Sequence, residues 1–587
     1  MTRVAWALSL IALGACSSKS ALKPAAGATT GAPGPDGTAA APPAREGGIA
    51  LPDASDAALA APTVELDCAR AAEHHGNAGC RFHAVPLAQT TVEGTCFAAF
   101  ITNPGSQPAT VKLERDGVAL PLGRALRLPR GTGRDLSYQP VEGDRIPPGE
   151  VGIVFLAQND DQTFVRCPSV VVPAVTGKTS LSVGTDVDPP AGLGSSFHII
   201  TDRPVIAYQV FPYGGGSSAV TSATLLLPEE TWGTSYLAVH PGQTGPARVG
   251  RVIAVVAAQD DTTVTMRPKA AVGGVPGVPA IAAGALGTIK LRAGQYVELG
   301  QMTEDLSGSV IAADKPIGVF GGAPCLEIPK GACCCDSAQQ QIPPLAAWGH
   351  EYAAIRYPSR AAATEESTPW RLVGAVDGTQ LRYAPAAPVG APASLGRGQV
   401  LDLDSDLAFV VSSQDEEHPF YLAGTMTGGE RFAGAGDPEF VNVLPTAQFL
   451  SSYVFFTDPT YPETHLVVVR RKGGDGKFSE VRLDCNPAAL GSWMPLGELE
   501  FTRVALSRGN FTPVIPGCDN GRQGMHSAAP FGVTVWGWGS SATGAAAPPS
   551  LAGYPSLPLP FWYTRFASYA YPAGGSIGRV NQVVVIP

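Results

Sequence analysis

The chain has 587 residues, which is long enough for several domains, and only 15% of them are charged. Its 69 glycines and 54 prolines indicate many turns. The formal net charge is −10 and no basic tract occurs, so nucleic acid and anionic membrane surfaces are excluded as expected partners.

The N-terminus has the features of a lipoprotein signal peptide, predicted over residues 1–15. The apolar stretch Val4–Ala12 is too short to span a bilayer. The following Leu-Gly-Ala-Cys resembles the lipobox, so Cys16 is the predicted lipidation site. Because Ser17 and not aspartate comes next, we expect an outer membrane lipoprotein that faces the periplasm or the cell surface. An ordinary secretory signal is the alternative, and it would also export the chain.

Residues 16–63 consist mainly of Ala, Gly, Pro, Ser and Thr and contain no aromatic side chain. Such a segment cannot bury a core, so it is predicted to be a disordered tether behind the lipidated cysteine. The rest of the chain, 64–587, is predicted to be one repeated all-β domain. Its expected units are approximately 64–250, 251–365, 366–460 and 461–587.

A Pro-x-x-x-aromatic-x-x-x-Tyr pattern, which we call the repeat anchor, occurs three times. The three copies are Pro228, Trp232 and Tyr236; Pro344, Trp348 and Tyr352; and Pro445, Phe449 and Tyr453. Identical spacing in otherwise divergent segments indicates one structural unit used several times. Large aromatic residues at fixed spacing usually pack, so the anchors are expected in the core or between units. An exposed ligand-stacking surface is the alternative.

Strand and turn signals surround the anchors. Asp202–Tyr208 and Asp314–Phe320 each predict a turn closed by proline and followed by a strand, with a weaker match at His418–Leu422. The Asp377-Gly378 pair between strand-like runs predicts a hairpin. We therefore expect an all-β fold with several repeated units of about four to five short strands. A propeller-like arrangement is favoured, and tandem β-sandwiches are the alternative.

The cysteine count predicts disulfides. Ten of the eleven cysteines are left when the predicted lipidation site, Cys16, is excluded. An even number is typical of a disulfide-bonded exported protein. Local pairing predicts Cys68–Cys80, Cys96–Cys167, Cys485–Cys518, and Cys325 with one cysteine of the run Cys333-Cys334-Cys335, taken as Cys334. The other two cysteines of the run either form a vicinal bond or show that a local pairing elsewhere is wrong. A metal site at the run is the alternative, which adjacent cysteines disfavour.

No catalytic, cofactor-binding or metal residue is expected. Gly574–Gly578 fits the Gly-x-Ser-x-Gly pattern, but no histidine or carboxylate follows it, as that mechanism requires. The nine histidines are scattered, so structural or solvated roles are expected for them. Asp402, Asp404 and Asp406 would share one face of a strand, where calcium is conceivable and a solvated face is the favoured interpretation.

Motifs around the second repeat anchor carry a resemblance to a known family. The central ones are Phe320-Gly321-Gly322, Cys325, Gln341-Ile342-Pro343-Pro344 and Trp348-Gly349-His350-Glu351-Tyr352. They resemble the centre of the IgG Fc-binding protein N-terminal domain, and flanking motifs extend the resemblance to roughly residues 68–578. Three adjacent cysteines are a departure from the family pattern.

The resemblance implies a non-catalytic, surface-displayed binding or adhesion module, here of a bacterial envelope lipoprotein. Its expected ligand is an extracellular protein or a glycan, and its expected membrane contact is the lipid at Cys16. The resemblance does not imply IgG binding. A structural envelope subunit that co-assembles with a fixed partner is the alternative. A glycan-active enzyme is a third interpretation, which would need two acidic side chains roughly 5–10 Å apart in a groove.

Overall fold

The computed structural model of the protein describes eleven stretches of the chain. They are residues 67–88, 95–159, 166–181, 191–214, 220–242, 250–331, 336–360, 366–432, 434–509, 511–539 and 566–587. Leu66–Pro587 forms one compact unit. The predicted signal peptide, Cys16 and the tether lie outside the described residues. Within the described stretches, no helix combines the length and the apolar character needed to cross a membrane.

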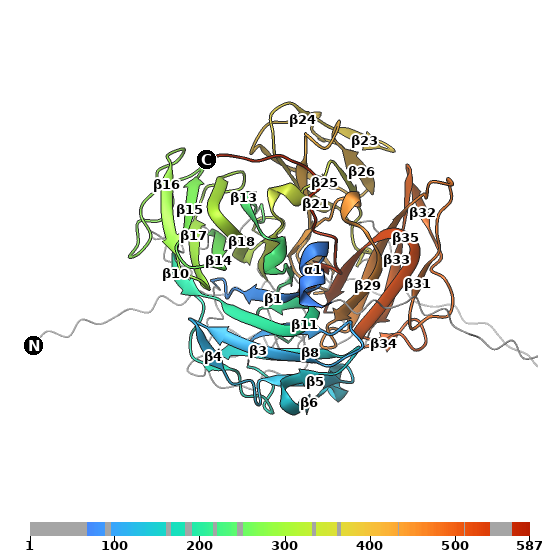
Figure 1. Ribbon diagram of the computed structural model, residues 1–587. Coiled ribbons are helices and arrows are strands. Elements are labelled where there is room, and N and C mark those ends of the chain that lie inside the picture. The colour runs from blue at the N-terminus through green and yellow to red at the C-terminus, as the bar shows by residue number, and fades with distance from the viewer. Residues whose placement is uncertain are drawn as a thin grey trace, which may run out of the picture. The chain divides into compact units, whose positions relative to one another are not determined.

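The described chain is all-β apart from the short helix α1 (Cys68–His74) and six 3-10 turns, and its strands form four groups (Figure 1). The first group contains β1 (Gly79–Ala84), β2 (Phe97–Thr102), β3 (Ala109–Arg115), β4 (Val118–Leu120), β5 (Leu126–Arg130), β6 (Ser137–Pro140), β7 (Arg145–Ile146), β8 (Val151–Gln158), β9 (Val175–Thr176), β11 (Phe197–Val210) and β12 (Ala223–Leu226). The second contains β10 (Ala191–Ser195), β13 (Gly233–Leu237), β14 (Arg251–Ala257), β15 (Thr262–Arg267), β16 (Gly287–Leu291), β17 (Gln295–Gln301), β18 (Val310–Leu326) and β19 (Asp336–Ile342).

The third group consists of smaller sheets and the fourth is again one sheet. The third contains β20 (Glu351–Ala354), β21 (Thr368–Gly374), β22 (Thr379–Gln380), β23 (Arg382–Ala384), β24 (Ser394–Leu395), β25 (Val400–Ser405), β26 (Phe409–Ser412), β27 (Phe420–Met426) and β28 (Glu439–Asn442). The fourth contains β29 (Leu450–Thr457), β30 (Glu463–Arg471), β31 (Val481–Leu483), β32 (Met494–Leu496), β33 (Leu499–Arg508), β34 (Thr512–Pro513), β35 (Gly521–Trp538) and β36 (Ser568–Pro572).

Three strands are much longer than the short strands expected from the sequence. β11, β18 and β35 have 14, 17 and 18 residues. In β11 and β18 the proline lies inside the strand and does not open it, which corrects the prediction for these two segments. Pro204 lies between the part of β11 that pairs with β3 and the part that pairs with β2. Pro316 lies between the β15-paired and β14-paired parts of β18. A proline fits at such an exchange because it has no N–H to donate.

Four inner strands meet in a closed cycle. β12, β19, β28 and β36 come from the first, second, third and fourth groups, and each contacts the next, with β36 returning to β12. Each pairs with a longer strand of its own group: β11, β18, β27 or β35. In Figure 1 the four groups accordingly lie around a common centre. This is the propeller-like arrangement that was favoured over tandem sandwiches.

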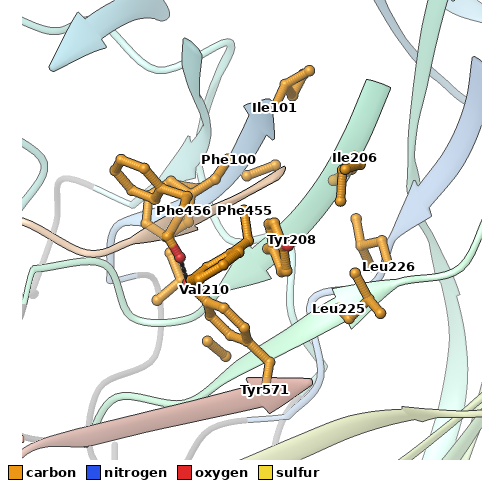
Figure 2. Close-up of a cluster of buried hydrophobic side chains, with 14 of the residues drawn as sticks. Phe100, Ile101, Ile206, Tyr208, Val210, Leu225, Leu226, Phe455, Phe456 and Tyr571 are labelled. Carbon is orange, nitrogen blue, oxygen red and sulfur yellow. Dashed lines mark hydrogen bonds between the residues drawn. The ribbon is translucent and has the colours of Figure 1, made fainter. Parts of the chain in front are cut away.

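Buried aromatic side chains join the first and fourth groups (Figure 2). The ring centroids of Phe100 and Phe456 are 4.6 Å apart, and those of Tyr208 and Tyr571 are 4.5 Å apart. The Tyr571 hydroxyl donates to the Phe456 carbonyl at 2.7 Å. Apolar contact between the first and last groups therefore closes the cycle without a covalent bond between them.

The centre of the cycle is polar. Gln340 on β19 donates from Nε2 to the carbonyls of Ala223 on β12 and Ala570 on β36. Three acidic side chains are also buried here: Asp336 at the start of β19, Glu439 at the start of β28, and Asp437 just before β28. Burial, together with the negative charges of Asp437 and Glu439, raises the pKa of Asp336 well above its usual range.

Candidate functional site

The three repeat anchors fold into the same local structure. The 3-10 turns η3 (Glu229–Thr231), η4 (Leu345–Ala347) and η6 (Thr446–Gln448) follow the three prolines. The hydroxyls of Tyr236, Tyr352 and Tyr453 accept from the backbone N–H groups of Gly233, Gly349 and Leu450, and donate to the carbonyls of Ile317, Phe420 and Phe531. Each tyrosine thus ties its own turn to a strand that comes later in the chain.

The anchor side chains are packed and not displayed. Trp232 is 7% exposed and Trp348 is 1% exposed, and their indole N–H groups donate to the carbonyls of Leu227 and Pro343. Phe449 in the third copy is half-buried. The anchors therefore expose little aromatic surface, which favours the packing interpretation over an exposed ligand-stacking surface.

Three of the four predicted cysteine pairs are present in the structure. Disulfides join Cys68 to Cys80, Cys96 to Cys167, and Cys485 to Cys518. Cys325 is also disulfide-bonded, whereas Cys333, Cys334 and Cys335 lie outside the described residues. The bonds lie in the first and fourth groups and at the end of β18, and none of the three located pairs joins two groups.

The three alternating aspartates do not form a compact carboxylate cluster. Asp402 and Asp404 lie on the exposed face of β25, and Asp406 follows the end of that strand. Both carboxylate oxygens of Asp402 accept hydrogen bonds from Arg371, at 2.8 and 2.7 Å. This bidentate pair already neutralises one of the three charges, so the solvated-face interpretation fits the observed contacts.

Two histidines and a glutamate, which we call the His83 cluster, converge at the junction of β1, β11 and η3. His83 and His198 are direct cross-strand partners in the β1–β11 pairing. Their rings stack with centroids 4.5 Å apart. Both Nε2 atoms lie 2.9 Å from Oε1 of Glu229, the first residue of η3. Side chains directly opposite on antiparallel strands are neighbours, so the strand register places the pair and the first anchor turn supplies the carboxylate.

The surroundings hold this cluster in place. His83 Nδ1 lies 2.8 Å from the Ser196 hydroxyl, which itself donates to the Gly294 carbonyl. Arg81 forms an ion pair with Oε2 of Glu229 at 3.0 Å. The ring of Trp232 lies 5.3 Å from that of His83. The cluster therefore adjoins the first repeat anchor.

Burial and hydrogen bonding set the charge states of the cluster. Burial lowers the pKa of His83, and the hydrogen bond to Glu229 opposes this effect only in part. Burial alone would raise the pKa of Glu229, but the close contacts of its carboxylate with His198 and His83 outweigh this effect and hold the pKa below its usual range. The site therefore combines an ionised carboxylate with an imidazole whose neutral form is favoured.

Sequence patterns gave no indication of this cluster, because its residues are far apart in the chain. One local signal exists in the first anchor turn. There the residues after the proline are Glu229 and Glu230, whereas the second copy has Leu345 and Ala346 and the third has Thr446 and Ala447. Within the described residues, His83, His198 and Glu229 are a group whose ligand atoms all lie within 4.8 Å of one another. Such a set can bind a proton or a divalent metal ion.

An apolar hollow lies between the third and fourth groups. Its described lining includes Ile355, Trp370, Phe449 and Trp536. None of the described residues that line it is acidic. It therefore does not offer the pair of carboxylates that the glycan-active interpretation requires.

Comparisons with known proteins find a family match and a related human protein. A family model described as "IgGFc binding protein" matches residues 222–537, a segment that includes all three repeat anchors. The human protein named IgGFc-binding protein is 27% identical to the chain over 263 residues, which cover 43% of the chain and 4% of the human protein. The chain therefore spans only a small part of that relative's length. No solved structure matches the chain.

Proposed function

The chain belongs to the IgGFc binding protein family, and we propose that it is a non-catalytic module that binds an extracellular protein. The observation that carries the proposal is the family match over residues 222–537. The proposal takes only the class of ligand, a protein, from the family. It does not extend to immunoglobulin, the ligand in the name of the human relative.

The cyclic arrangement of sheets supports a binding role. A cycle closed by its inner strands holds the connecting loops at fixed positions, which lowers the entropy lost when a ligand binds. Large apolar side chains are exposed in several of these loops, with Val170 49%, Val389 94% and Leu407 61% exposed. Because the repeat anchors are buried, we assign ligand contact to such loops.

We further propose that the module is held at an outer membrane. The sequence features that support this are the apolar stretch before the lipobox, Cys16, and the Ala- and Gly-rich residues that follow. A lipid on Cys16 would anchor the chain, and the segment up to residue 63 would separate the folded unit from the bilayer.

The proposal is tested by binding the full chain to defined fractions of the producing cell's envelope. The immobilised chain is offered envelope proteins and, separately, envelope polysaccharides. A retained protein is purified and titrated against the folded chain by calorimetry. The proposal predicts saturable binding with a fixed stoichiometry.

A reduced and alkylated chain, unfolded under the same buffer conditions, is the control for non-specific adsorption. Retention by both forms, or binding of polysaccharide alone, contradicts a protein ligand. A partner that cannot be separated from the chain without denaturant indicates the structural-subunit alternative.

A further inference from the structure

We propose that the His83 cluster, formed by His83, His198 and Glu229, is a binding site for a divalent transition-metal ion, with Zn²⁺ as the best-matched ion. Imidazole nitrogen and carboxylate oxygen are ligands that Zn²⁺ uses in proteins. This site is independent of the proposed protein ligand.

The ligand atoms are already close to the separation that one ion needs. Each histidine Nε2 lies 2.9 Å from Glu229 Oε1. Zinc–ligand bonds of about 2.0–2.2 Å in a tetrahedron place the ligand atoms roughly 3.3 Å apart. A small movement of Glu229 Oε1 away from the two nitrogens, which themselves lie within 4.8 Å of each other, would therefore admit an ion, and the fourth position would be left for water or a ligand atom from elsewhere.

The hydrogen bonds of His83 and Ser196 leave a position for a cation beside His83 Nε2. The Ser196 hydroxyl uses its single proton to donate to the Gly294 carbonyl, so it accepts from His83 Nδ1–H. His83 Nε2 then faces the Glu229 carboxylate at 2.9 Å. With Nδ1 protonated, a neutral His83 turns its Nε2 lone pair toward that oxygen, and the two repel each other. A metal ion between the two atoms would replace this repulsion by two bonds, whereas a proton there would charge a buried ring.

His198 also faces the Glu229 carboxylate without a hydrogen bond between them. Its Nε2 is buried and forms no well-aligned hydrogen bond, although Glu229 Oε1 lies 2.9 Å away. A carboxylate of Glu114 lies 3.9 Å from its Nδ1. Metal-bound histidines usually donate from the second nitrogen to a carboxylate, which fixes the tautomer and orients the ring, and Glu114 is the carboxylate near enough to take that role if the ring tilts.

Binding would require one local adjustment. The two rings are parallel to within 3°, so an ion in the plane of one ring lies outside the plane of the other. The side chain of His198 is 24% exposed, whereas that of His83 is 2% exposed, so His198 is the ring with room to tilt. Arg81 pairs with Oε2 of Glu229 and leaves Oε1 directed at the histidines.

An ion here would join three segments that are distant in the chain. It would connect the N-terminal strand β1, the long strand β11 and the first anchor turn η3, and it would stabilise the folded chain in proportion to its occupancy. The acidic turn at Glu229 and Glu230 distinguishes this anchor from the other two copies, which have no carboxylate there and accordingly no such site.

The test uses the untagged full chain, stripped with a chelator and titrated with Zn²⁺ by calorimetry. The wild type is compared with His198→Ala and Glu229→Gln, and with His74→Ala as a matched control at an exposed histidine of the adjacent helix α1. The proposal predicts one ion per chain in the wild type and the control, and at least tenfold weaker binding in the other two variants. Binding that is absent from the wild type, or unchanged in all variants, overturns it and leaves a proton as the bridging cation.

A second measurement covers the case in which a variant does not fold. The wild type is loaded with one equivalent of Cu²⁺, and electron paramagnetic resonance counts the nitrogen ligands through their hyperfine splitting. Two imidazole nitrogens support the site. A spectrum with one or none overturns it.

Discussion

The same pair of hydrogen bonds recurs at the three anchor tyrosines, Tyr236, Tyr352 and Tyr453. Each hydroxyl is buried, accepts one backbone hydrogen bond and donates another. A buried backbone carbonyl that loses its donor carries a desolvation cost, so these hydroxyls contribute to stability beyond the packing of their rings.

Tyr352→Phe tests that contribution. The variant keeps the ring but removes the donor to Phe420 and the acceptor for Gly349, so the free energy of unfolding is expected to fall by about 1–3 kcal/mol. Tyr383→Phe is the matched control, because the Tyr383 hydroxyl donates a single bond to the Pro392 carbonyl and its side chain is only half-buried. Denaturant unfolding measures both. A larger loss in the control would contradict the role assigned to the anchor tyrosines.

Glu298 gives the protein a specific dependence on pH. It lies fully buried on β17, where burial raises the pKa of its carboxyl group to about 8, against a normal 4.5. Between these values the folded state holds a proton that the unfolded state has released. The free energy of unfolding should therefore fall as pH rises from about 4.5 to 8, by up to about 1.4 kcal/mol per pH unit from this group.

Glu298→Gln should remove that part of the slope. The amide retains an oxygen to accept from the Ala88 N–H group, which now donates to the carboxylate oxygens at 3.2 and 3.3 Å. Denaturant unfolding of both proteins at a series of pH values gives the difference directly, and the other buried acids cancel in it. Parallel curves for the two proteins would show that Glu298 does not carry this proton.

At the scale of elements, each anchor turn packs on a glycine of an earlier strand or turn. A methyl group built on Gly79, Gly233 or Gly349 would lie 2.4, 2.8 or 2.3 Å from Cβ of Pro228, Pro344 or Pro445. The contacts are made by β1 with η3, β13 with η4, and β20 with η6. Successive groups thus meet through the same close approach of glycine to proline.

Gly349→Ala is expected to disrupt one of these contacts. The added methyl group requires the Pro445 turn to move, and overpacking of this kind costs about 1–3 kcal/mol of the free energy of unfolding. Gly474→Ala is the control, because nothing lies within 4 Å of its added methyl group. Thermal and denaturant unfolding should distinguish the two variants. Equal stability of both would mean that the groups do not depend on this approach.

The sequence predicted the repeated elements better than their limits. The anchors share a spacing that survives because each needs a proline, an aromatic ring and a tyrosine at fixed positions within one turn and one strand. The ends of the strands were harder to predict from the sequence. Pro204 and Pro316 normally indicate the start of a strand, but β11 and β18 continue through them and only change their pairing partner there. Strand β13 pairs with β18 of the second group although it precedes residue 251, since the anchor turn carries the chain from one group to the next.

At the scale of the whole molecule, the contacts between the inner strands, which close the cycle, were the hardest feature to predict from the sequence. Strand β19 consists of Asp-Ser-Ala-Gln-Gln-Gln-Ile, which lacks the apolar run of an ordinary buried strand. Its polar side chains are nevertheless buried, because they bond to the backbones of other inner strands, as Gln340 does. The His83 cluster was hidden for a related reason. The pairing of His83 with His198 depends on a register between distant strands.

The family resemblance carried by the motifs around Trp348 is confirmed by the match over residues 222–537. That segment begins at the first inner strand and ends within β35, so it covers three anchors and the strands that they tie down. β1 and β11, which hold the two histidines of the His83 cluster, precede it. The metal site is thus a proposal about this chain and not about the family segment.

The central claim is that this cyclic all-β module binds an extracellular protein without changing it. The most direct measurement is a titration of the full chain with its purified protein partner, followed by mass spectrometry of the recovered partner after prolonged incubation. The account predicts saturable binding with a fixed stoichiometry and a partner of unchanged mass. A partner that is cleaved or chemically altered, or a complete absence of saturable binding to envelope proteins, would contradict it.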